Sequence, residues 1–287
     1  MIVMLTRSRL AVAAFCLISA AGCTSPAPEK QPAGSGSGSD KPQLIQVAIA
    51  NCMKGKGFKY VPWVPKVEMG EGARKAMLGD YEEMRKDRSE NGFGIFVPSA
   101  NRKPLWKESD SPNSAIKNQL SEAQLASYDK ALTGCRIQAV KQVTGKVVAS
   151  DADLAEQENK LIQQAIERDL NGDPTLIELA SAMGDCLKGK GYRVDSLRPS
   201  DMERRGSKEF EEQKRRIALN DDIPENGLPE GRYYEPHLSA ATTKQYLAKE
   251  VKAALDDLEC GKDFYPAYLP RTTEIAYRVS AEFGKGL

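Results

Sequence analysis

The sequence has one histidine in 287 residues and no long uninterrupted apolar run. With only His237, metal sites built from several histidines are excluded, and a Ser-His-Asp relay would have to use that residue. An excess of one charge is also missing, because 41 Lys and Arg stand against 40 Asp and Glu. A protein that follows a phosphate backbone is typically much more basic, so we expect no nucleic-acid partner.

The first 22 residues have the order of a secretory signal. Arg7 and Arg9 precede a largely apolar run from Leu10 to Ala21, and small residues follow it. This run is too short to cross a hydrocarbon core about 30 Å thick at about 1.5 Å per residue. We therefore assign residues 1–22 to a signal peptide, expect the chain to be exported, and expect no lasting transmembrane helix.

Residues 20–23, Ala-Ala-Gly-Cys, resemble the lipobox of bacterial lipoproteins. The resemblance implies that Cys23 becomes the N-terminus and carries acyl chains such as palmitate, on the outer face of the cytoplasmic membrane. Ala20 departs from the Leu that the family prefers, and ordinary signal cleavage with a free Cys23 thiol is the alternative. Residues 23–43 are rich in Pro, Gly and Ser, so we predict a lipidated flexible tether there.

The number of cysteines is consistent with export. Cys16 lies in the predicted signal and Cys23 is the predicted anchor, which leaves four of the six cysteines. An even number in an oxidising compartment predicts two disulfides. The four residues are Cys52, Cys135, Cys186 and Cys260.

An internal duplication organises the rest of the chain. Residues 51–59 read Asn-Cys-Met-Lys-Gly-Lys-Gly-Phe-Lys, and residues 185–193 read Asp-Cys-Leu-Lys-Gly-Lys-Gly-Tyr-Arg. Downstream of each match lies an aromatic residue followed by Glu-Glu, at Tyr81 and at Phe210. Two copies of one unit fit a chain of this length. We predict repeat unit 1 at 44–150, a connecting helix at 151–173 and repeat unit 2 at 174–287.

The four cysteines permit three disulfide pairings. A duplicated unit that folds by itself favours pairing within each copy, which joins Cys52 to Cys135 and Cys186 to Cys260. The two pairings between copies are the alternatives.

Local patterns predict helices with short extended segments. Apolar residues recur at helical spacing in each copy, and Ser121, Asp173 and Ser239 stand at predicted helix starts. Each Lys-Gly-Lys-Gly predicts a left-handed helix end, followed by a strand such as 58–62. We predict a mainly α (α+β) fold of two similar helical units with short extended segments, each closed by one disulfide and joined by a connecting helix.

Two motifs that suggest ion binding have simpler structural explanations. The Lys-Gly-Lys-Gly glycines follow a helix, and the negative end of a helix dipole disfavours a phosphate. Residues 169–173 begin like a calcium loop, but Pro174 and Ala180 occupy the positions that need Gly and Glu. We predict no metal site and no cofactor.

Catalytic groups are also not predicted. Adjacent acids on one helix point apart, and the spacing of Glu211 with Arg215 and of Glu212 with Arg216 predicts surface ion pairs. We interpret His237 as a surface or packing residue, and we predict that the protein is not an enzyme.

Aromatic residues concentrate in the first copy. Such rings stack on sugars or anchor peptides, and core packing is the alternative explanation. If one copy binds a ligand, we expect the first. The candidate binding residues are Tyr60, Trp63, Phe96 and Trp106.

The segment from Cys52 to Pro62 reads Cys-Met-Lys-Gly-Lys-Gly-Phe-Lys-Tyr-Val-Pro. It resembles the Cys-Met-x-x-x-Gly-Phe-x-Tyr-x-Pro segment of uncharacterised extracytoplasmic lipoproteins of actinobacteria. In those proteins an acidic helix and a Tyr-Gly-Tyr-Gly-like segment commonly follow, for which this chain has Tyr81-Glu-Glu and Asn91-Gly-Phe-Gly. The resemblance implies location and disulfides, but it brings no activity or catalytic residue.

These features predict a membrane-anchored, non-enzymatic binding or envelope-structural module. We expect the membrane as a partner through the N-terminal lipid, together with a cell-wall, peptide or protein ligand. One alternative is a self-protection lipoprotein that sequesters a wall-active peptide antibiotic. Another is a cell-wall hydrolase, which would depend on His237 or a Glu in a cleft.

Overall fold

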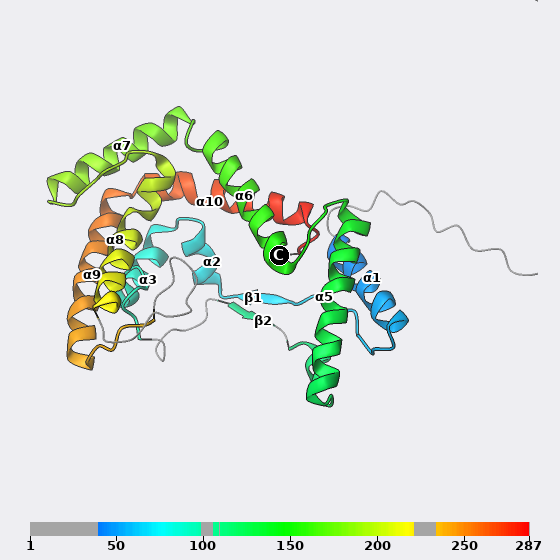
Figure 1. Ribbon diagram of the computed structural model, residues 1–287. Helices are drawn as coiled ribbons and strands as arrows, with labels where there is room; N and C mark the ends of the chain where they lie inside the picture. The colour runs from blue at the N-terminus through cyan, green and yellow to red at the C-terminus, as the bar shows by residue number, and fades with distance from the viewer. Residues whose placement is uncertain (1–39, 99–105, 109, 221–233, 287) are drawn as a thin grey trace, which may run out of the picture. The chain divides into compact units, whose positions relative to one another are not determined.

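The computed structural model describes residues 40–98, 106–108, 110–220 and 234–286. Nearly all regular structure there is helical, which confirms the predicted mainly α fold (Figure 1). The helices are α1 (Lys41–Gly55), α2 (Glu71–Met77), α3 (Tyr81–Asn91), α4 (Pro112–Lys117), α5 (Glu122–Thr144), α6 (Asp151–Asp169), α7 (Pro174–Gly189), α8 (Pro199–Leu219), α9 (Ala240–Cys260) and α10 (Phe264–Glu282). Strands β1 (Val67–Met69) and β2 (Trp106–Glu108) pair antiparallel, with Val67 opposite Glu108.

Both predicted disulfides are present. Cys52 and Cys135 join α1 to α5, and Cys186 and Cys260 join α7 to α9. The Cα atoms of the bonded cysteines lie 5.6 and 5.5 Å apart. Each copy is therefore closed by one bridge between its first long helix and the helix that carries its second cysteine.

The predicted helix starts are confirmed by their hydrogen bonds. Ser121 and Gln124 form a reciprocal capping box before α5. The Asp173 side chain accepts from the backbone N–H of Leu176, and the Ser239 side chain accepts from that of Thr242. These side chains satisfy amides that the first turn of a helix leaves without partners.

The two Lys-Gly-Lys-Gly segments end α1 and α7 as predicted, but no strand follows directly. Gly57 has φ 82° and Gly191 has φ 86°, a conformation that favours glycine. Residues 58–66 have no strand pairing, and β1 begins only at Val67. Pro62 and Pro65 lack the N–H that a strand ladder requires, which explains the delay.

Helix α1 begins at Lys41, within the range predicted for the tether. Pro42 lies in its first turn, where a missing N–H costs no hydrogen bond. Residues 1–39 lie outside the described residues, so the signal peptide, Cys23 and most of the tether stay predictions. In the described ranges no helix combines the length and the hydropathy that crossing a bilayer requires.

The predicted connecting helix corresponds to α6, whose N-cap is Ser150. It packs against α10, and its apolar side chains Leu154, Ala165 and Ile166 are buried. Helix α6 follows α5, which carries Cys135, and α10 follows α9, which carries Cys260.

Packing does not follow the boundary between the two copies. Helix α3 of the first copy packs against α9 of the second, and α8 packs against both α7 and α9. By contrast, α1 and α5 pack mainly on each other; Figure 1 shows them side by side in blue and green. One cluster of buried side chains includes Met53 and Tyr128 from the first copy with Met183 and Tyr265 from the second. The two copies therefore share a core.

Candidate binding site

The aromatic residues predicted to bind are partly used inside the fold. Phe96 is only 2% exposed, and its ring stacks on Tyr246 with centroids 4.7 Å apart, so a ligand cannot stack on it without local opening. Tyr60 and Trp63 are partly buried; the Tyr60 hydroxyl donates to Gln46 Oε1 at 2.8 Å. Trp106 lies in β2 opposite Met69, and its side chain lies outside the described residues. Of the four, only Phe96 is therefore enclosed in the fold, among those whose side chains are described.

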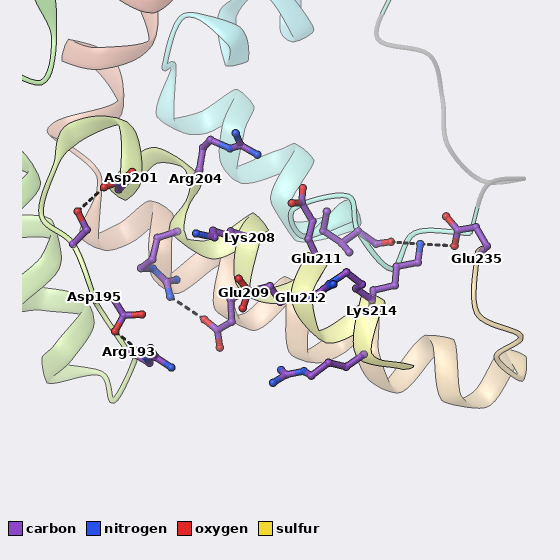
Figure 2. A pocket seen from close by; sticks show the side chains of 15 residues that line it. Arg193, Asp195, Asp201, Arg204, Lys208, Glu209, Glu211, Glu212, Lys214 and Glu235 are labelled. Carbon is purple, nitrogen blue, oxygen red and sulfur yellow. Dashed lines mark hydrogen bonds and ion pairs between the residues drawn. The ribbon is translucent and has the colours of Figure 1, made fainter. Parts of the chain in front are cut away.

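A hollow lies beside α8. It is a groove of about 1140 Å³, which we call the α8 groove. Its walls come from α8, from the segment 193–196, from Ile95 and from Glu235 (Figure 2). Seven basic and six acidic side chains line it, so any ligand meets charge of both signs.

Several of these charges already have partners at the groove edges. Arg193 pairs with Asp195 at 2.7 Å, and Arg205 pairs with Glu209 at 2.9 Å. At one end, Lys214 pairs with Glu235 at 2.6 Å and donates to the backbone oxygen of Ile95. Figure 2 shows this end with its dashed lines.

A second set of charges points to the groove without such partners. Arg204, Lys208, Glu211 and Arg215 follow each other on α8 at spacings of four, three and four, so they share one face of the helix. Within the described residues none of these four side chains has a hydrogen bond or an ion pair. Among the described residues, neither the predicted surface pair of Glu211 with Arg215 nor that of Glu212 with Arg216 is formed. We call Arg204, Lys208, Glu211 and Arg215 the α8 charge row.

A buried charge cluster lies behind the groove. Asp257 has a side chain only 1% exposed and pairs with Arg88 at 2.9 Å and with Arg205 at 3.4 Å. The Tyr265 hydroxyl donates to the same carboxylate, and burial together with the charge of Asp257 raises the pKa of Tyr265. Because a lone buried charge is costly, these partners keep α3, α8, α9 and α10 in register.

Glu250 on α9 is fully buried. Its carboxylate accepts three backbone N–H groups that follow α3: Phe93 at 2.8 Å, Ile95 at 2.7 Å and Phe96 at 2.8 Å. Gly92 and Gly94 have positive φ, which turns these amides toward one point. Burial raises the pKa of Glu250, while the three amides act in the opposite direction. The segment Gly92–Phe96, which forms part of the groove wall, is therefore anchored to α9.

The second Lys-Gly-Lys-Gly segment is tied to α9 by Asp256. Lys190 pairs with Asp256 at 2.8 Å, and the Tyr192 hydroxyl donates to it at 2.7 Å. Hydrogen bonds from Lys190, Lys252 and Tyr192 hold the pKa of Asp256 far below its usual range. These contacts support the prediction that the segment is a structural helix end.

Neither candidate ion site gains support. In the described part of the chain no group of three or more His, Cys, Asp or Glu is arranged to hold a metal. Asp173 of the calcium-like segment instead caps α7 and pairs with Arg271 at 2.8 Å. His237 is exposed shortly before α9.

We compared the chain with protein-family models, with curated proteins and with solved structures. None of the three comparisons found a match.

Sequence reasoning did not find the α8 groove. A signal was present, because the charge row keeps helical spacing within a segment predicted to be helical. The opposite wall could not be predicted, because its residues are distant in the sequence. Ile95 precedes the row by over a hundred residues, and Glu235 follows it by about twenty.

Proposed function

We propose that this protein is a lipid-anchored extracytoplasmic lipoprotein that acts as a non-enzymatic binding or envelope-structural module. The observation that carries the proposal is the presence of the two disulfides, Cys52 with Cys135 and Cys186 with Cys260. Structural disulfides persist in oxidising compartments outside the cytoplasm. They fit the signal-like N-terminus and leave Cys23 as the remaining mature cysteine, at the position that lipobox proteins acylate.

The α8 groove supports the binding part of the proposal. It is lined by charges, several of which have no hydrogen-bond or ion-pair partner among the described residues. A charged groove suits reversible recognition of a polar partner, because complementary charge provides specificity and fast association.

Metabolic labelling in the native host tests the anchor. Cells are fed a clickable palmitate analogue, and wild type is compared with Cys23→Ser and with the matched control Cys16→Ser. We expect label in wild type and in the control, recovery of both with membranes, and digestion by protease added to spheroplasts. The Cys23→Ser protein should carry no label.

Two outcomes would contradict the proposal. One is equal labelling of the Cys23→Ser variant. The other is wild-type protein that is unlabelled and protected from protease in intact spheroplasts, since both the lipid and the location would then be wrong.

A further inference from the structure

The charge row presents alternating sign along the α8 groove. Arg204 and Lys208 form a basic end, Glu211 is the acidic middle, and Arg215 is the second basic end. Arg204, Lys208 and Arg215 are exposed, and Glu211 is partly exposed. Because the described protein supplies none of the four with a hydrogen bond or ion pair, their charges are available to a ligand.

The spacing of the row defines the size of a complementary ligand. At about 1.5 Å per helical residue, Arg204 and Arg215 are separated by roughly 16 Å along the axis, with Glu211 between them. An extended peptide rises about 3.3 Å per residue, so five to six residues cover the same length. The groove itself is long enough to take such a segment, since its lining reaches from Arg204 to Arg216.

We infer that the α8 groove binds an extended peptide segment whose acidic residues flank a basic residue. This inference rests on the proposed function and names the ligand class of its binding site. Acidic ligand groups pair with the two basic ends of the row, and the basic group pairs with Glu211. A uniform polyanion fits less well, because Glu211 and the neighbouring Glu212 repel its middle.

Two ion pairs of the groove, Lys214 with Glu235 and Arg205 with Glu209, limit where the ligand lies. Lys214 is 7% exposed and is already used by Glu235 and the Ile95 backbone oxygen. Arg205 is held by Glu209 and by the buried Asp257. The ligand therefore contacts the charge row and leaves these pairs intact.

The test uses the mature lipidated protein in a non-ionic detergent. The probe is the capped peptide Asp-Asp-Gly-Lys-Gly-Asp, joined through a neutral linker to a fluorescent dye and followed by anisotropy at low salt. The comparison probes are the same peptide with Asp in place of Lys, and inorganic polyphosphate. We expect the mixed-charge peptide to bind more tightly than the all-acidic peptide, and its binding to weaken as salt rises.

Charge reversal provides the sharper readout. Lys208→Glu and Arg215→Glu should each weaken binding of the mixed-charge peptide about ten-fold or more, because like charges then face each other. Glu211→Lys should exchange the preference, so that the all-acidic peptide binds better than the mixed one. Lys130→Glu is the control: Lys130 is exposed on α5, outside the groove, and its variant should bind like wild type.

Three results would overturn the inference. The first is that the mixed-charge peptide does not bind at millimolar concentration. The second is that the Lys208→Glu and Lys130→Glu variants bind it equally well. The third is that the wild-type protein prefers polyphosphate or the all-acidic peptide. None of them changes palmitate labelling at Cys23, so failure here is distinguishable from failure of the proposed function. Thermal melts confirm that each variant is folded.

Discussion

The buried carboxylate of Glu250 accepts the backbone N–H of Phe96 at 2.8 Å, although the two residues are 154 positions apart. The same carboxylate accepts the N–H groups of Phe93 and Ile95. One side chain of the second copy therefore accepts the backbone N–H groups of a turn in the first copy. This contact joins the duplicated halves more directly than the sequence suggested.

Glu250→Ala should destabilise the protein by about 3 kcal/mol. The substitution leaves three N–H groups, one buried and two partly buried, without an acceptor, and hydrogen bonds to a charged group are among the stronger ones. Urea denaturation followed by circular dichroism measures the change. Gln245→Ala is the control, because Gln245 is exposed on the same helix. Equal midpoints for the two variants would show that the three hydrogen bonds do not stabilise the fold.

Gly206→Ala should destabilise the protein even though alanine favours helices. A Cβ at Gly206 on α8 would lie 2.1 Å from the Phe93 ring, so α8 and the segment after α3 would have to separate. Gly134→Ala on α5 is the matched control, since a Cβ there meets no atom within 4 Å. The control should gain about 0.5 to 1 kcal/mol from helix propensity alone. Melting temperatures that rise in both variants would contradict the close contact with Phe93.

Asp256→Asn should lower stability at neutral pH, with an effect that fades in acid. The pKa of Asp256 in the folded protein is lowered by Lys190, Lys252 and Tyr192, so the ionised carboxylate stabilises the folded state. This contribution is present above the ordinary Asp pKa of about 3.9 and is lost as the pH falls toward the lower folded value. Urea midpoints of wild type and variant should therefore begin to converge as the pH falls below about 4.

The exposed pair of Lys188 and Asp185 provides the comparison for Asp256. Its side chains are 48% and 71% exposed, and ion pairs in such surroundings contribute little. Asp185→Asn should therefore change the midpoint only slightly at pH 7. A constant difference between wild type and Asp256→Asn from pH 7 to pH 3 would contradict the assigned cause.

The two disulfides should be reduced in a defined order under native conditions. Cys186 is exposed, whereas Cys135 is fully buried and its partner Cys52 is only partly exposed. A reductant must reach a sulfur atom, so the bridge of Cys186 with Cys260 should open first. Limited reduction, alkylation and peptide mapping by mass spectrometry reveal the order. Earlier alkylation of Cys52 and Cys135 would be the opposite result.

Each bridge should also contribute to the stability of the chain. Closure of a loop of 74 or 83 residues restricts the unfolded state, which corresponds to about 4 to 5 kcal/mol in the entropy model. Cys135→Ala together with Cys52→Ala should lower the urea midpoint at least as much as the double variant of Cys186 and Cys260. A midpoint unchanged by either double variant would show that the bridges do not restrain the unfolded chain.

Local features of the structure were predictable from the sequence because their causes are local. Ser121, Asp173 and Ser239 cap helices through neighbours three residues away. Gly57 and Gly191 end helices because only glycine adopts positive φ without strain. The disulfide pairing followed from the duplication, since equivalent cysteines in equivalent units are expected to pair alike.

Other features depended on contacts that no local pattern records. The strand predicted at 58–62 is absent because prolines just beyond the helix interrupt strand pairing. Strand β1 begins later and pairs with β2, which lies some forty residues further along the chain. Phe96 was a candidate binding residue by composition, yet it packs against Tyr246 and Phe210 of the second copy. An aromatic side chain has the same sequence signature whether it faces solvent or a core.

By itself, the sequence determined three helix starts, the two glycine-rich helix ends and the two bridges, because hydrogen bonds between close neighbours and a repeated pattern suffice for these. Only the tertiary structure decided that α3 packs on α9, that Glu250 accepts the amides after α3, and that the charge row on α8 lines a groove. These arrangements join residues far apart in the chain, and they are selected by the joint burial of apolar area and the pairing of buried charges across the whole fold.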